Sequence, residues 1–170
     1  QLVEGFQALS YEYYGNVLTL KNSKNTPVYS TNQCIFELDN VYRIDTLIIK
    51  FNNNVDKNNV VSAFDYRNIN NITIQYMDGN GNMRNLKRYG MNNSNFSNQI
   101  LGGGTTNDLY RIDVNNITDE NELSVYTSKI VITIGDSSNN ISDYNDNNNN
   151  GYISQYSIFG GDRTLISKND

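Results

Sequence analysis

The sequence predicts an all-β fold, an antiparallel β-sandwich or jelly roll of about eight strands with minimal helix. Three observations favour this class. Ile, Val, Thr and Tyr together account for 51 of the 170 residues, and β-branched and aromatic side chains fit a pleated surface. Ala and Glu, which favour helices, number only two and five. Short runs of alternating apolar and polar residues are separated by turn-forming Asn and Gly.

The chain carries 32 Asn, so we first asked whether it folds at all. Leu, Ile, Val and Phe make up about 26% of the residues, above the roughly 20% below which disorder is expected. A chain of this length supports one domain. Within that domain we expect an N-terminal arm and first strand over residues 1–33 and the β-sandwich over residues 34–170.

Period-two alternation predicts each strand in turn. We expect strands at Val17–Leu20, Cys34–Leu38, Tyr42–Phe51, Ile72–Tyr76, Met83–Tyr89, Tyr110–Val114, Ile130–Ile134 and Tyr152–Phe159. Asp78 to Gly81 has the composition of a tight hairpin turn. Ile130, Ile132 and Ile134 alternate with Val131 and Thr133, which indicates burial on both faces of that strand. Single helical turns are expected near Asp56–Phe64 and Thr118–Leu123.

Composition excludes several kinds of chemistry. There is no His and only one Cys, which removes a Ser-His-Asp triad, a His-bearing metal site, Cys₄ zinc and an intrachain disulfide. A net charge of −5 argues against nucleic acid as a partner. No apolar stretch approaches the roughly 18 residues of a membrane span, so we expect no direct membrane insertion by this segment.

Several stretches resemble discoidin-type domains, also called coagulation factor 5/8 C-type domains, which have a galactose-binding-like β-sandwich. The residues that are similar to this family are Phe36–Phe51, Ile72–Met83, Lys129–Ile134 and Gly151–Gly160. The resemblance implies a non-catalytic module that binds glycans, lipid headgroups or proteins through loops at one end of the sandwich. The chain departs from the family because it has no Trp for those loops and cannot form the disulfide common in its secreted members.

A second resemblance lies at the start of the chain. Leu2–Phe6 is similar to a Glu-Gly-Phe stretch that often follows the membrane anchor of virion proteins of large DNA viruses. Because residue 1 is Gln and not Met, we expect this chain to be the processed or ordered part of something longer. Two roles follow. The first is a glycan- or surface-binding recognition module of a larger extracellular or virion protein, and the second is a structural minor capsid or coat protein.

One loop has the spacing of a calcium site. Counted from Asp146, oxygen-bearing side chains occupy positions 1, 3, 5 and 9, glycine occupies position 6, and the position 7 carbonyl completes the set. The candidate ligands are Asp146, Asn148, Asn150, Tyr152 and Ser154. Position 12 is Ser157 instead of the bidentate Glu. Ca²⁺ is therefore the one cofactor that the sequence suggests, and a solvated turn is the alternative.

Other constellations have simpler interpretations. The carboxylate pairs Asp39 with Asp45 and Glu120 with Glu122 suit any solvated face, and we expect no enzymatic activity. Arg84, Lys87 and Arg88 would protect a sheet edge against aggregation. Tyr11, Tyr13, Tyr14, Tyr144 and Tyr152 supply area for packing against the sandwich ends, for a sugar platform or for a neighbouring subunit in a homo- or hetero-oligomer.

Overall fold

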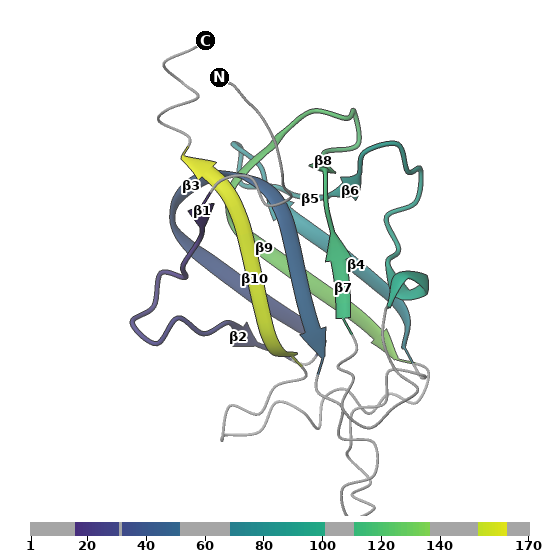
Figure 1. The fold of residues 1–170 in the computed structure, drawn as a ribbon, viewed down its shortest axis with the longest axis horizontal. Helices are drawn as coiled ribbons and strands as arrows, with labels where there is room; N and C mark the ends of the chain where they lie inside the picture. Colours follow the sequence, from purple (N-terminus) through teal and green to yellow (C-terminus); the bar gives the residue numbers. More distant parts are fainter. Residues whose placement is uncertain (1–15, 31, 52–68, 101–110, 137–152, 163–170) are drawn as a thin grey trace, which may run out of the picture.

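A computed structural model describes residues 16–30, 32–51, 69–100, 111–136 and 153–162. These residues form an antiparallel, curled β-sheet structure (Figure 1). The strands are β1 (Asn16–Val17), β2 (Val28–Tyr29), β3 (Gln33–Phe51), β4 (Ile69–Met77), β5 (Met83–Asn85), β6 (Lys87–Arg88), β7 (Arg111–Val114), β8 (Ile117–Thr118), β9 (Val125–Asp136) and β10 (Ile153–Asp162). Within these ranges, a 3₁₀ turn, η3 (Ser97–Gln99), lies between β6 and β7. The predicted all-β, sandwich-like fold is confirmed.

Strand β3 organises the molecule because it belongs to both layers. It has 19 residues, and a shift of register against β9 between Glu37 and Tyr42 marks the place where it turns from one layer to the other. The sequence predicted two strands here, Cys34–Leu38 and Tyr42–Phe51. The structure joins them, because the intervening residues bulge out of the ladder without ending it.

Two layers result from this bend (Figure 1). The first half of β3 pairs with β2 on one side and β9 on the other, and β4 and β5 follow β9. The second half pairs with β10 and β7, and β1 lies outside β10. A separate two-stranded sheet is formed by β6 and β8. All of these pairings are antiparallel.

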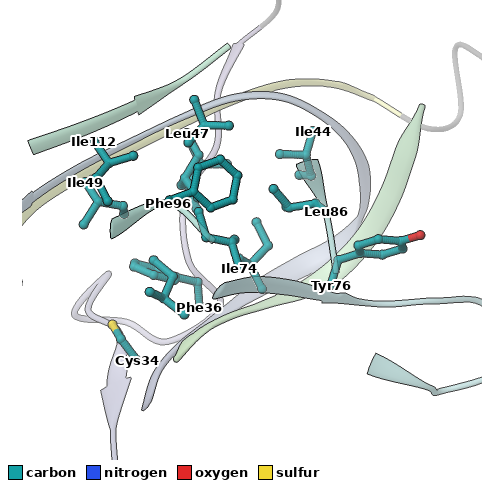
Figure 2. Close-up of a cluster of buried hydrophobic side chains, with 14 of the residues drawn as sticks. Cys34, Phe36, Ile44, Leu47, Ile49, Ile74, Tyr76, Leu86, Phe96 and Ile112 are labelled. Atoms are coloured by element: carbon teal, nitrogen blue, oxygen red, sulfur yellow. The ribbon is translucent and has the colours of Figure 1, made fainter. Parts of the chain in front are cut away.

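The core lies between the layers (Figure 2). Phe36 from the first half of β3 faces Leu47 and Ile49 from the second half, and Phe96 fills the space between them from the loop before η3. Cys34 is also fully buried at one end of this cluster. In β9, Ile130, Val131, Ile132 and Ile134 are all at most 5% exposed, which confirms the predicted burial on both faces.

The predicted hairpin at Asp78–Gly81 is confirmed. Met77 pairs with Met83 across the turn, Gly81 has a positive φ of 84°, and the Asp78 carboxylate accepts hydrogen bonds from the Asn80 and Asn82 N–H groups. The returning segment differs from the single strand predicted at Met83–Tyr89. It breaks at Leu86, whose side chain is fully buried, and the chain then leaves β4 to pair with β8.

The helical turn predicted at Thr118–Leu123 is wrong. The Asp119 carboxylate accepts hydrogen bonds from the N–H groups of Asn121 and Leu123, and Glu122 has a positive φ of 64°. Local side-chain bonds of this kind compete with helix formation. The other predicted helical turn, at Asp56–Phe64, lies outside the described residues.

Candidate functional site

A hollow of about 530 Å³ opens at the end of the sandwich where β7 ends and β6 and β8 pair. Figure 1 labels these three strands. We call it the Tyr89 hollow. Its lining residues are Arg43, Asp45, Thr46, Tyr89, Asn115, Asn116, Ile117 and Thr118. They come from β3, from the turn after β6, and from the β7–β8 connection with β8, so three separate stretches of chain build it.

Backbone pairing holds two of these stretches together. Arg88 pairs with Ile117, and the Tyr89 N–H donates to the Asn116 carbonyl oxygen over 2.8 Å. Asn116 has a positive φ of 53°, a conformation that Asn tolerates better than most residues. As a result the Tyr89 side chain stays in solvent, 63% exposed, and the Asn115 and Asn116 side chains are exposed beside it.

An ion pair from β3 forms another part of the lining. The Arg43 guanidinium donates to both carboxylate oxygens of Asp45, with Nε to Oδ1 at 2.7 Å and Nη2 to Oδ2 at 2.9 Å. This hydrogen bonding raises the pKa of Arg43 above its ordinary value. Both side chains are partly exposed, at 30% and 23%, so the pair offers free edges to a ligand in a fixed planar geometry.

Two glycines in β10 make room for Arg43. A Cβ atom on Gly161 would lie 2.7 Å from the Arg43 Nη2 atom, and one on Gly160 would lie 1.9 Å from the Arg43 carbonyl oxygen. The register between β3 and β10 also shifts between Phe159 and Gly160. Gly160 and Gly161 therefore let β10 approach β3 closely enough for the guanidinium to lie against its backbone.

The chemistry of the Tyr89 hollow suits polar, hydroxyl-rich ligands. An exposed aromatic ring can stack on the apolar face of a sugar, while amides and a bidentate ion pair present donors and acceptors in fixed positions. The volume lies within the range of about 300–1,000 Å³ that is usual for small-molecule sites. Two hydrogen bonds from Arg43 fix the position of the Asp45 carboxylate.

A second concavity, of about 460 Å³, lies on another side of the sandwich. It runs between β10 and the segment from Asn25 to Tyr29, where the edges of the two layers meet, and we call it the seam groove. Two tyrosines cross it in opposite directions. The Tyr29 hydroxyl donates to the Ile153 carbonyl oxygen over 3.1 Å, and the Tyr156 hydroxyl lies 3.0 Å from both the carbonyl and the side-chain oxygen of Asn25.

The calcium loop predicted from the sequence falls almost entirely outside the described residues. Asp146, Asn148, Asn150 and Tyr152 lie outside them, and Ser154 belongs to β10, at a shift of register against β3. Within the described part of the chain, no three Cys, Asp or Glu side chains are grouped to hold a metal ion. Calcium binding stays a prediction, and a rise of the thermal midpoint on adding Ca²⁺ would support it.

The tyrosines singled out in the sequence, Tyr11, Tyr13, Tyr14, Tyr144 and Tyr152, also lie outside the described residues. Leu2–Phe6, the stretch whose resemblance suggested the coat role, lies outside them as well, so that role stays a prediction. No helix within the described ranges is long and apolar enough to cross a membrane.

The three basic residues of the predicted edge cluster do not share one surface site. Arg84 pairs with Asp78 at 2.6 Å. Lys87 donates to the Met91 carbonyl oxygen at 2.8 Å, and Arg88 to the Asp113 carbonyl oxygen at 2.6 Å. Each of these side chains stabilises a turn or a loop through its contact, and none of the three lines the Tyr89 hollow.

Among the described residues that line the Tyr89 hollow, Asp45 alone is a candidate functional residue from the sequence, as half of a carboxylate pair with Asp39. In the structure Asp45 pairs with Arg43, and Asp39 accepts a hydrogen bond from the Tyr42 hydroxyl at 2.5 Å. Tyr89, Asn115 and Asn116 were missed. The one available signal was an Asn-Asn step between two short apolar stretches, which is not distinctive in a chain this rich in Asn.

Comparisons with known proteins return no relative. No family model matches the sequence, and neither the curated proteins nor the solved structures contain a match.

Proposed function

We propose that the protein is a non-catalytic recognition module that binds a glycan in the Tyr89 hollow, as part of a larger protein at an extracellular or virion surface. The observation that supports this most is Tyr89 itself. Its ring is 63% exposed beside a hollow of about 530 Å³. Exposing an aromatic ring to water has a free-energy cost that ligand binding would recover.

The polar lining supports the same proposal. Neighbouring hydroxyl groups of a sugar each donate and accept, and planar side chains match such pairs. Asn115 and Asn116 offer amides, and the Arg43–Asp45 pair offers a guanidinium and a carboxylate whose relative positions are set by two hydrogen bonds of 2.7 and 2.9 Å. Preorganised polar groups reduce the entropy lost on binding.

A glycan array tests the proposal directly. The full chain, labelled at its terminus, should bind a limited set of glycans saturably. Tyr89→Ala should lower the affinity for the best of them about tenfold, which corresponds to about 1.4 kcal/mol. Leu123→Ala is the matched control, because Leu123 is 62% exposed but does not line the hollow, and it should leave the affinity unchanged.

Three outcomes would count against the proposal. The first is that no glycan on the array is bound above background. The second is glycan binding that Tyr89→Ala does not weaken, and the third is an equal loss of affinity in Tyr89→Ala and Leu123→Ala. The fold of both variants is checked by circular dichroism. Because both side chains project into solvent, neither substitution is expected to disturb the core.

A further inference from the structure

Strand β3 has an unpaired stretch on one edge where it passes the Tyr89 hollow. Its ladder with β9 ends at Ile44, and its ladder with β7 begins at Leu47. Within the described residues, no strand pairs on this edge with Asp45 or Thr46, which lie between those two positions. Both residues line the hollow, so the hollow opens at a break in the sheet.

A β-bulge on the other edge of β3 directs the side chains at this break. Ile44 and Thr46 pair with neighbouring residues of β10, so Asp45 between them is an extra residue without a partner in that strand. The bulge interrupts the alternation of the strand, because Ile44, Thr46 and Leu47 are all buried while Asp45 reaches the surface. Bulges of this kind often re-aim side chains beside functional sites.

The Thr46 hydroxyl is a polar group that the protein leaves unused. Thr46 is only 3% exposed, yet its hydroxyl has no hydrogen-bond partner among the described residues. The hydroxyl is not sealed in the core, since Gln99 Oε1 is the one fully enclosed side-chain oxygen without a partner in the described ranges. Because Thr46 lines the hollow, its hydroxyl is open to a ligand there.

The other buried threonines of the described chain use their hydroxyls within the protein. The Thr118 hydroxyl donates to the Asp119 carbonyl oxygen over 2.9 Å, and the Thr127 hydroxyl donates to the Met77 carbonyl oxygen over 2.8 Å. Nearly buried hydroxyl groups are normally satisfied in this way. Thr46 therefore differs from both in having its hydrogen-bonding capacity available to the hollow.

The charges in the lining of the Tyr89 hollow balance each other. Arg43 and Asp45 are its two charged residues, and two hydrogen bonds of 2.7 and 2.9 Å join them. A ligand carboxylate bound to the guanidinium would lie close to the Asp45 carboxylate, and like charges repel. The net charge of −5 on the whole chain also disfavours an anion. Hydroxyl groups avoid this repulsion, because they accept from Arg43 and donate to Asp45 without carrying charge.

From these observations we infer that the Tyr89 hollow selects an uncharged sugar unit and rejects acidic sugars. Adjacent hydroxyl groups of the sugar bond to the Arg43–Asp45 pair, and another bonds to the Thr46 hydroxyl. This inference rests on the proposed function, to which it adds the class of sugar and a specificity-determining residue, Thr46.

The test compares three forms of each glycan on an array. They are the neutral glycan, the same glycan with a carboxylate in place of the primary alcohol of its terminal sugar, and the methyl ester of that acid. Affinities of the complete chain for the best-bound set are then measured by fluorescence polarisation. We expect the neutral and ester forms to bind within about twofold of each other and the acid about fivefold or more weakly. The ester separates the effect of charge from that of size.

Asp45→Asn tests the charge balance. Without the Asp45 carboxylate, the Arg43 guanidinium is uncompensated, so this variant should bind the acid more tightly than the neutral form. Asp113→Asn is the matched control, because Asp113 forms the same kind of pair with Arg111, two positions earlier in its strand, but does not line the hollow. The control should keep the preference of the wild type.

Thr46→Val tests the unused hydroxyl, and Thr127→Val is its control. Thr46→Val should weaken the neutral glycan about fivefold or more and should leave the urea midpoint unchanged or higher, because no bond within the described protein is lost. Thr127→Val should do the opposite. It removes a hydroxyl that bonds to the Met77 carbonyl, so it should lower the urea midpoint and leave the glycan affinity unchanged.

Four results would overturn the inference while leaving the proposed function in place. They are wild-type binding of the acid that equals or exceeds binding of the neutral form, an ester that binds as weakly as the acid, an unchanged preference in Asp45→Asn, and an unchanged affinity in Thr46→Val. An array on which no glycan is bound would instead remove the proposed function, and the inference with it. The two failures are therefore distinguishable.

Discussion

At Gly160 the β10 backbone passes so close to β3 that a Cβ atom would lie 1.9 Å from the Arg43 carbonyl oxygen. A neighbouring backbone atom cannot move aside as the end of a side chain can. We therefore expect Gly160→Ala to lower the free energy of unfolding by about 1–3 kcal/mol, the usual range for an overpacked site. Urea denaturation of the two proteins measures this difference.

Gly79→Ala is the control for that substitution. Nothing lies within 4 Å of the Cβ position at Gly79, and its φ is not in the left-handed region, so its stability should change by less than about 1 kcal/mol. Equal losses in the two variants would contradict the close approach at Gly160.

Some of these residue roles could not be foreseen from the sequence. Gly160 and Gly161 look like an ordinary strand terminus, and only the approach of β3 explains why both positions lack a side chain. Tyr89 followed by Gly90 looks like a turn, but the exposure of its ring depends on Asn116, which is 27 positions later. The sequence predicts local conformation well and contacts between distant residues poorly.

Two turns of the same design join strands in this fold. In the first, the Asp78 carboxylate accepts from the N–H groups two and four positions later, and Gly81 has the positive φ. In the second, Asp119 accepts in the same pattern and Glu122 has the positive φ. Each turn also closes with a backbone bond of 2.8 Å, from the Asp78 N–H to Asn82 and from the Asp119 N–H to Leu123.

Acid should weaken the first turn. The Arg84 guanidinium, together with N–H donors of the turn, holds the pKa of Asp78 below its ordinary value of 3.8. A carboxyl whose folded-state pKa is lowered stabilises the native state above its unfolded-state pKa, and this stabilisation is lost as the pH falls through the folded-state value. We expect Asp78→Asn to lower the thermal midpoint at about pH 7, and we expect the difference from wild type to shrink as the pH falls below 3.8 through the folded-state pKa of Asp78.

Arg84→Gln should lower the thermal midpoint at about pH 7 by part of the amount seen for Asp78→Asn. The double variant should melt at about the same temperature as Asp78→Asn, because both changes remove the same contact at 2.6 Å. Thermal melts across the pH range measure all three variants. A difference between wild type and Asp78→Asn that persists undiminished in acid would contradict this account.

The first turn is predictable from the sequence and the second is not, for a physical reason. Gly79 and Gly81 mark the hairpin after Asp78, because glycine is the residue that usually takes a positive φ. The second turn has Glu at the corresponding position, so its sequence looked compatible with a helical turn. There the hydrogen bonds of the Asp119 side chain determine the backbone conformation, and propensity alone does not reveal them.

At the scale of the whole molecule, β3 makes the two layers one unit. Its first half carries Phe36 and its second half carries Leu47 and Ile49, and all three are at most 1% exposed in one cluster. We therefore expect a single cooperative unfolding transition. Far-ultraviolet circular dichroism and tyrosine fluorescence should give coincident urea curves. Two separated transitions would show that the layers unfold independently.

The class of the fold could be predicted because it depends on period-two alternation within each strand. The arrangement of the layers could not, since the predicted gap between Leu38 and Tyr42 looked like a loop between two strands and is a bend within one. The Tyr89 hollow could not be predicted from the sequence for a related reason. The pairing of β6 with β8 that assembles it involves two residues from each strand, too few for any periodic signal.

The solitary thiol of Cys34 offers an experimental advantage. It is fully enclosed in the native core, and desolvation raises its pKa far above the ordinary value, so alkylating dyes should not modify it while the protein stays folded. A cysteine introduced at an exposed site such as Leu123 would then take up a fluorophore selectively, with the native residue left in place. Ligand titrations by single-dye fluorescence thus become possible without first engineering a cysteine-free background.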